Sequence, residues 1–138
     1  MAGSDEMRDL LNRLYDSIET NNPAAWTDAV AEDVFGVGSD PDEWWEGRDA
    51  FVTVLRAQIE LMSAANVRFL SGTPRIFEQG DVVWAVDRPT ISLPDGTSTS
   101  TRLTLIASRG AGQLKIRHFH LSVGVPNEEH VGQELPTS

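Results

Sequence analysis

The stretch that decides the fold runs from residue 97 to residue 125 and reads TSTSTRLTLIASRGAGQLKIRHFHLSVGV. It holds two segments rich in β-forming residues, 97–108 and 113–125, on either side of the turn sequence Gly110-Ala111-Gly112. A glycine-containing turn of this length between two such segments indicates neighbouring antiparallel strands. This part of the chain is therefore predicted to form a long β-hairpin.

Two further segments of the same kind, 67–79 and 82–93, precede the hairpin, and Gly, Asp and Pro turn residues separate all four segments. Consecutive segments joined by short turns predict an antiparallel meander. Segments near twelve residues are about twice the usual strand length, so we expect strong curvature. Because proline has no N–H to donate, Pro74 and Pro89 are predicted to interrupt the strand pairing.

The first 62 residues have a helical period instead. Apolar residues recur three and four positions apart between residues 5 and 20, as in an amphipathic helix: Met7, Leu10, Leu11, Leu14, Tyr15 and Ile18. Asn22 and Pro23 predict the start of a short second helix, residues 35–37 a short strand, and the apolar spacing over 51–62 a third helix. We therefore predict an α+β fold in which three N-terminal helices pack on a strongly curved antiparallel sheet and form a cone.

Composition limits the domain organisation and the partners. A chain of 138 residues suits one domain, predicted at residues 1–125, with an extended or loose tail at 126–138. The formal net charge of −10 disfavours nucleic acid and anionic membranes as partners. No apolar run approaches the ~18 residues of a membrane span, and residues 1–20 lack the features of a secretory signal, so we expect a cytoplasmic protein. The absence of cysteine excludes disulfides and thiol nucleophiles, and no cofactor is predicted.

The loop from Gly38 to Arg48 contains the step Asp40-Pro41 and two adjacent tryptophans, Trp44 and Trp45, among several carboxylates. Tryptophan is both large and amphipathic, so two of them in an acidic loop suggest a pocket mouth that is partly apolar and partly wet. The alternative is that both tryptophans cap the end of the hydrophobic core.

The predicted order of helices and strands, the loop Gly38–Gly47 and the run Ile116–Gly124 together resemble the SnoaL-like branch of the nuclear transport factor 2-like superfamily. The run 116–124 is also similar to the last strand of the calcium/calmodulin-dependent kinase association domain. The resemblance implies a cone-shaped fold and a homodimer formed through the sheet. It leaves the function open, because the superfamily includes ketosteroid isomerases, polyketide cyclases, dehydratases and non-catalytic binding or assembly modules.

The resemblance also assigns candidate roles. Asp40 lies where ketosteroid isomerases have a proton-shuttling aspartate, and this implies an acid or base role for Asp40; the alternative is local hydrogen bonding to backbone N–H groups. The isomerases hold the developing oxyanion with a tyrosine of the first helix, but Leu14 occupies that position and Tyr15 is one residue off. Loss of one such donor typically costs ~10²–10³-fold in rate, which disfavours steroid isomerisation. Arg102 aligns with a pocket arginine of the association domain and is expected to line the cavity and anchor an acidic group, or else to pair with a nearby carboxylate.

The other candidates come from periodicity. His118 and His120 share one face of the last strand and Phe119 the other, so if Arg102 lines the pocket, Phe119 faces it and the histidines face a neighbouring subunit or solvent. His120 is the second candidate for proton transfer, and His118 for ligand binding. Two histidines without a clear third ligand predict no metal site. Trp44, Phe119 and Trp84 are expected to enclose an apolar ligand, and Gln58, on the apolar face of the third helix, to bond either the sheet or the ligand.

Two functions follow from these residues. The first is a homodimer that binds a small, mostly apolar molecule bearing a polar or acidic group, with or without proton-transfer chemistry of the isomerase, cyclase or dehydratase type. The second is a non-enzymatic ligand-sensing or assembly module. An open cone favours binding or catalysis, whereas a cone filled by side chains favours assembly.

Overall fold

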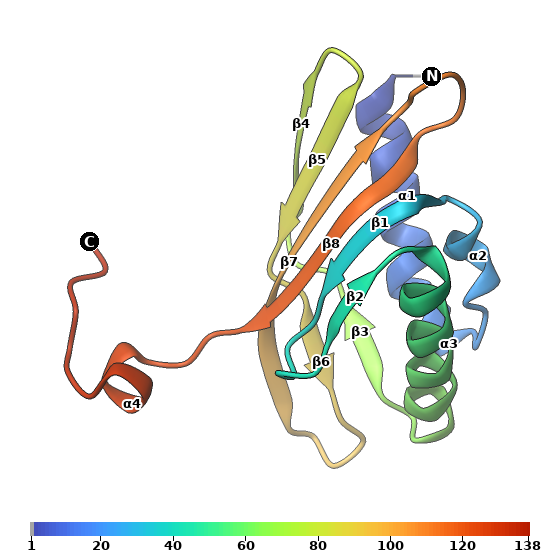
Figure 1. Cartoon of the computed structure of the whole chain (residues 1–138). Helices are drawn as coiled ribbons and strands as arrows, with labels where there is room; N and C mark the ends of the chain where they lie inside the picture. Colours follow the sequence, from blue (N-terminus) through green and yellow to red (C-terminus); the bar gives the residue numbers. More distant parts are fainter. Residues whose placement is uncertain (1) are drawn as a thin grey trace.

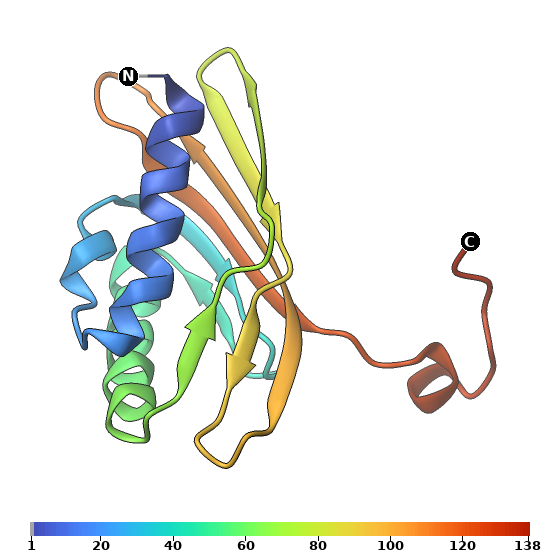
Figure 2. The same ribbon diagram turned by 180° about the vertical axis from the view of Figure 1, so that it is seen from behind.

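The computed structural model describes residues 2–138 as helices on one side of a curved sheet (Figure 1). The helices are α1 (Gly3–Glu19), α2 (Ala24–Thr27), α3 (Arg48–Ala64) and α4 (Asn127–Val131). The strands are β1 (Val30–Val37), β2 (Trp44–Glu46), β3 (Arg68–Leu70), β4 (Arg75–Gln79), β5 (Val82–Asp87), β6 (Thr90–Ser92), β7 (Ser98–Ser108) and β8 (Lys115–Val123). Helix α1 lies behind the sheet in Figure 1 and in front of it in Figure 2. The predicted α+β fold with three helices on one face is confirmed.

The strands follow the order β2-β1-β8-β7-β5-β4, and β6 joins β3 to β7. The pairings β4 with β5, β5 with β7 and β7 with β8 are antiparallel and form the predicted meander. The meander prediction did not include strand β1. This strand pairs with β8, and the two run parallel. Strand β2 was also expected to be loop; it pairs with β1 and makes a hairpin of the acidic loop.

The predicted breaks in the strands are confirmed. The segment 67–79 is divided into β3 and β4 before Pro74, and the segment 82–93 into β5 and β6 around Pro89. The register nevertheless continues across the second break, since Asp87 pairs with Leu103 and Thr90 with Ser100 on the same long strand β7. The sheet can therefore bend at the break and bring β3 and β6 round toward α1 and α3, which gives the cone its second wall (Figure 2).

The core fills the closed end of the cone. The apolar stripe of α1 is buried against the inner face of the sheet, where Leu103, Leu105 and Phe119 alternate with outward residues. Position 36 of β1 has room only for glycine, because a Cβ atom there would be 2.4 Å from the ring of Phe51. Helix α3 consequently packs directly on the β1 backbone.

The other face of the sheet, called here the outer face, is not covered by any helix of residues 2–138. Its residues are partly or largely exposed, and they include the apolar side chains Phe35, Val37, Phe77, Val82, Trp84, Val86 and Ile106. The Trp84 ring stacks on Phe77 with centroids 5.5 Å apart. Figure 1 looks onto this face.

The tail leaves the domain after β8. It was expected to be extended or loose, but residues 127–131 form the short helix α4, which lies apart from the rest of the molecule in both views (Figures 1 and 2). None of its residues is buried. Among residues 2–138, no helix has the length and apolar character required to cross a bilayer.

Candidate binding cavity

A partly open cavity of about 240 Å³ lies between α1, α3 and the inner face of the sheet. Its walls are mostly apolar: Leu14, Ile18, Trp45, Leu55, Ile59, Met62, Val67, Phe69, Ile91, Phe119 and Leu121. Polar groups enter from Ser17 on α1, Gln58 on α3, and Gly38, Ser39 and Glu43 of the acidic loop. Ligand pockets for drug-sized molecules measure roughly 300–1,000 Å³, so this cavity suits a smaller molecule.

Helix α3 places Gln58 in the cavity by simple periodicity. Gln58 is three residues from Leu55 and four from Met62, so it lies on the same face of the helix as these two cavity residues. The Gln58 amide does not bond the sheet. Its Nε2 atom donates a hydrogen bond of 2.6 Å to Glu43 Oε2 at the cavity wall.

Glu43 is held at this position from two sides. Its Oε1 atom accepts a hydrogen bond of 2.8 Å from the backbone N–H of Asp40, while its Oε2 atom accepts the bond from Gln58. Its side chain also folds over Gly38, where an added Cβ atom would lie 2.7 Å from the Glu43 side chain. Among the lining residues, all of which the structure describes, Glu43 is the one ionisable side chain.

Asp40 is exposed and does not line the cavity. Its Oδ1 atom accepts a hydrogen bond of 2.9 Å from the N–H of Asp42, and its backbone carbonyl accepts one from the N–H of Glu43. Asp40 therefore shapes the turn, as the alternative reading of this residue expected, and its neighbour Glu43 brings the carboxylate to the cavity.

The two tryptophans of the loop point in opposite directions because they are consecutive residues of β2. Trp45 pairs with Gly36, is buried and lines the cavity. Trp44 pairs with Val37, is 64% exposed and packs edge-on against Phe35 on the outer face. Trp44 was expected to enclose a ligand; the cavity-lining residue is Trp45.

Arg102 was expected to line the cavity, and this expectation is wrong. The register pairs Arg102 with Ser122, so its side chain shares the outer face with His120 and His118 and is exposed. Its Nε atom donates a hydrogen bond of 3.2 Å to Ser122 Oγ. The sequence analysis placed Arg102 and Phe119 on the same face of the sheet. That placement requires a different register between β7 and β8, and the sequence does not specify the register.

Phe119 does line the cavity, as expected, and the histidines lie on the opposite face. His118 Nδ1 lies 2.8 Å from the carbonyl oxygen of Phe35, and His120 is exposed. Trp84 likewise lies on the outer face. Of the expected site residues, the cavity brings together Gln58 and Phe119, while Asp40, Trp44, Trp84, Arg102, His118 and His120 lie outside it.

Tyr15 is also outside the cavity, where Leu14 stands in its place. The Tyr15 hydroxyl donates a hydrogen bond of 2.6 Å to Asp87 Oδ2, and the N–H groups of Gly72 and Arg88 donate to the same carboxylate. Burial, followed by the hydrogen bond to Asp87, raises the pKa of Tyr15 above its ordinary value. This network joins α1 to the sheet and provides no oxyanion donor to the cavity.

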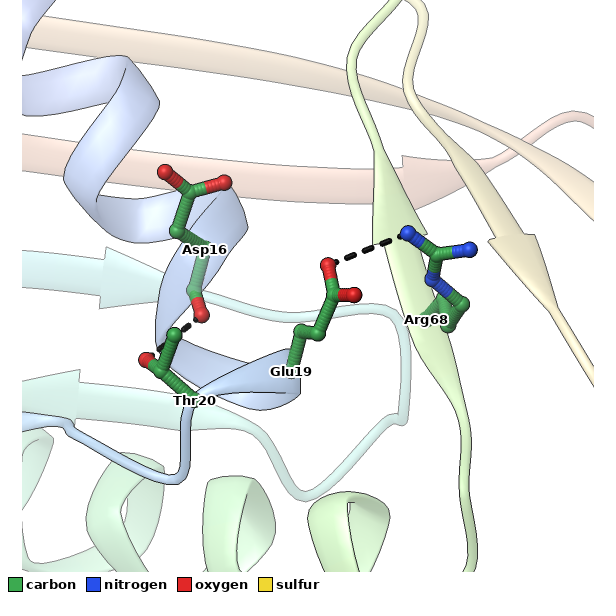
Figure 3. Close-up of polar contacts among 4 residues, drawn as sticks. All are labelled: Asp16, Glu19, Thr20 and Arg68. Atoms are coloured by element: carbon green, nitrogen blue, oxygen red, sulfur yellow. Dashed lines mark hydrogen bonds and ion pairs between the residues drawn. The ribbon is translucent and has the colours of Figure 1, made fainter.

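An ion pair links α1 to β3 (Figure 3). Arg68 Nη2 on β3 lies 3.0 Å from Glu19 Oε2 near the end of α1, and the Thr20 hydroxyl donates to the carbonyl of Asp16. Both charged side chains are more than half exposed, so the pair contributes at most about 1 kcal/mol to stability. It links the two elements that supply Ile18 and Phe69 to the cavity.

Glu43 was not foreseen as a site residue, since it is one of several carboxylates in the loop. The spacing from Gly38 to Glu43 is the signal that would have found it. In a hairpin that turns through Asp40-Pro41-Asp42, the carbonyl of Glu43 accepts from the N–H of Gly38, and the glycine leaves room for the longer side chain.

Comparison with known proteins agrees with this architecture. A crystal structure of an NTF2-like protein of unknown function from Pseudomonas putida KT2440 superposes with a TM-score of 0.77 and 18% identity, over 98% of this chain and 94% of that one. A protein from Shewanella frigidimarina, provisionally described as a ketosteroid isomerase, gives 0.67 and 15%, over 83% and 92% of the two chains. At these identities the likeness shows a shared fold.

A third structure is provisionally described as a calcium/calmodulin-dependent protein kinase type II association domain, from Thiobacillus denitrificans. It superposes with a TM-score of 0.67 and 16% identity, over 84% of this chain and 93% of that one. No curated protein matches the chain. The family profile described as a SnoaL-like domain matches residues 7–126. The chain belongs to the SnoaL-like family, and it shares its fold with NTF2-like proteins.

Proposed function

We propose that this protein binds a small, mostly apolar molecule in the cone cavity and recognises a hydrogen-bond donor on that molecule through Glu43. The main support for this proposal is the position of the Glu43 carboxylate. Hydrogen bonds from Gln58 and from the Asp40 N–H hold it beside the apolar walls of the cavity. Each carboxylate oxygen can accept more than one hydrogen bond, so acceptor sites remain for a ligand hydroxyl or amine. The partly open cavity favours ligand binding over the assembly role that a filled cone would favour.

The charge of the cavity determines which polar group fits. Arg102 was the main support for an acidic ligand, and it lies on the outer face. The ionisable group in the cavity is a carboxylate, which repels an anion and attracts a neutral donor or a cation. The proposed ligand is therefore an apolar molecule with a hydroxyl, amide or amine group, and not a carboxylic acid.

Proton-transfer chemistry of the isomerase, cyclase or dehydratase type would use Glu43 as the acid or base. Such a reaction also needs donors for a developing negative charge on oxygen. The Ser17 hydroxyl donates to the carbonyl of Leu14, and one N–H of Gln58 is occupied by Glu43. Binding is therefore the better supported function, and a reaction would have to avoid an enolate.

The test begins with mass spectrometry of small molecules that are released on denaturing the purified protein. Calorimetry then compares two ligands with the same apolar skeleton, one ending in a primary alcohol and the other in a carboxylate. We expect the alcohol to bind at least about tenfold more tightly, since an unpaired anion next to Glu43 loses hydration without gaining a cation. Tighter binding of the carboxylate would overturn the proposal.

We also propose that two copies associate through the outer face. Phe77, Val82 and Val86 are each more than one third exposed there, next to Trp84, on a face that no helix covers. Apolar side chains gathered in this way favour burial against a second surface. Light scattering at micromolar concentration should give twice the 15.2 kDa mass of the chain, and a monomer at all concentrations would exclude this association.

A further inference from the structure

Three arginines converge on a groove at the end of the outer face where β8 leaves the sheet. Arg75 from β4, Arg88 after β5 and Arg102 from β7 line this groove, whose volume is about 570 Å³. It is separate from the cone cavity, which lies on the other side of the sheet. The groove is a basic site on a chain whose formal net charge is −10.

The three arginines line the same groove, and none of them forms an ion pair with a carboxylate among residues 2–138. Continuing the register Asp87 to Leu103 by one residue on each strand places Arg88 opposite Arg102, and like charges in that position destabilise a sheet. The carboxylate of Asp87, which also borders the groove, accepts hydrogen bonds from Tyr15 and two backbone N–H groups. A negative group from outside the fold would relieve this repulsion.

The tail has the complementary chemistry. Its charged side chains Glu128, Glu129 and Glu134 are all exposed, and so are the apolar Val125, Val131 and Leu135. Helix α4 has five residues and buries none of them. Helices shorter than about 12–15 residues are marginal in water unless tertiary packing stabilises them. A surface that combines apolar side chains with positive charge would complement the tail.

The tail begins beside the groove but points away from it. A Cβ atom on Gly124 would lie 3.9 Å from the guanidinium carbon of Arg102, and from there α4 projects away from its own domain (Figures 1 and 2). The residues from 126 to 138 span up to roughly 43–47 Å when extended, enough to cross onto a neighbouring molecule. If two copies associate through their outer faces, this length lets each tail reach the other copy's groove.

We infer that the acidic tail of one copy binds the Arg75–Arg88–Arg102 groove of a second copy, so that the two tails are exchanged within a homodimer. The inference rests on the proposed association through the outer face and is independent of the ligand cavity. Glu128 and Glu129 meet the arginines, while Val131 and Leu135 pack on the exposed apolar side chains Val86 and Phe77.

Charge exchange in the 138-residue chain tests this contact. A groove variant carries Arg88→Glu with Arg102→Glu, and a tail variant carries Glu128→Lys with Glu129→Lys. Each variant alone places like charges in contact, so its homodimer should weaken by about tenfold. In a mixture, both tail-groove contacts are attractive again, and native mass spectrometry should show heterodimers well above the statistical fraction. Arg8→Glu with Arg56→Glu, on the helical side, is the matched control and should leave the wild-type dimer unchanged.

Hydrogen exchange of the amides in residues 127–135 provides the second readout. Protection is expected in the wild-type dimer, loss of protection in each variant and recovery in the mixture. A dimer that persists with both variants behaving like the control would overturn the tail contact while leaving the proposed association intact. A third outcome would also overturn the exchange. If mixing the two variants does not restore protection, but a monomeric chain with all four substitutions is protected, then each tail binds the groove of its own chain.

Discussion

At the scale of single residues, two carboxylates have different tasks because their partners differ. Asp87 is buried and accepts hydrogen bonds from Tyr15, Gly72 and Arg88, which leaves its oxygens little capacity for a ligand. Glu43 is partly exposed at the cavity and retains acceptor capacity. Asp87 therefore stabilises the fold, whereas Glu43 has free acceptor capacity for the recognition that we propose.

Tyr15→Phe should cost about 1–3 kcal/mol of unfolding free energy, because Asp87 loses a buried hydrogen-bond donor. Urea denaturation measures this loss. Thr20→Val removes an exposed local hydrogen bond at the end of α1 (Figure 3) and should change stability by less than about 0.5 kcal/mol. Equal effects of the two substitutions would mean that the Tyr15–Asp87 hydrogen bond contributes no more to the unfolding free energy than the exposed Thr20 bond does.

The raised pKa of Tyr15 also predicts alkaline destabilisation. The protonated hydroxyl stabilises the folded state fully below the ordinary tyrosine pKa of 10.0, and this contribution is lost as the pH rises from there toward the higher folded pKa. The chain has one tyrosine, so tyrosinate absorbance follows this group alone. Stability of the wild type should fall above about pH 10 more steeply than that of Tyr15→Phe. Titration of the folded protein at the ordinary value would contradict this.

The residue scale is also where the sequence was least informative. Gln58 and Phe119 were identified because a helix face and a strand face follow from residue spacing alone. Arg102 was misplaced, since its face depends on the pairing with Ser122, which no local pattern reveals. Asp40 was identified as a candidate and Glu43 was not, because side-chain length and the turn geometry together decide which carboxylate returns to the cavity.

At the scale of elements, the cavity depends on how closely α3 approaches β1. Gly36 allows the Phe51 ring to pack against the strand backbone, with Trp45 on the neighbouring strand. Helices α1 to α3 and the breaks at Pro74 and Pro89 were predictable, since periodicity and proline chemistry are local. Strand β2 was not predictable, because its pairing with β1 turns a polar loop into a hairpin through tertiary contacts.

Gly36→Ala should destabilise the protein by about 1–3 kcal/mol, since a methyl group there overlaps the Phe51 ring and forces α3 outward. Chemical denaturation reports the change, and ligand binding should weaken with it because Leu55, Gln58 and Ile59 move with the helix. Gly112→Ala is the control, as an added Cβ meets nothing within 4 Å there. Identical denaturation midpoints for the two variants would show that the close packing of α3 on β1 is not required.

At the scale of the whole molecule, the sheet separates two surfaces to which we propose separate roles. The inner face bears the cone cavity, and the outer face bears exposed apolar side chains and the arginine groove. A change on one face should therefore leave the other function intact. Mutations on opposite faces separate ligand binding from association.

Trp84→Glu should weaken the proposed dimer by at least about 30-fold, because a buried aromatic side chain at an interface centre commonly contributes 2 kcal/mol or more. Sedimentation measures the dissociation constant, and circular dichroism checks that the fold is retained. Leu61→Glu on α3 is the matched control, since this side chain is 72% exposed on the helical side. A dimer equally sensitive to Leu61→Glu would place the interface elsewhere.

The most direct test of the central claim is a calorimetric titration of the molecule identified in the purified protein into the wild type, Glu43→Gln and Glu46→Gln. Glu43→Gln keeps the size of the side chain and an acceptor for Gln58 but removes the charge, whereas Glu46 is exposed on β2 and outside the cavity. We predict that Glu43→Gln weakens binding by at least about tenfold, in line with the ~1.5–3 kcal/mol of a hydrogen bond to a charged group, and that Glu46→Gln leaves it unchanged. Equal affinity of all three proteins would contradict recognition through Glu43.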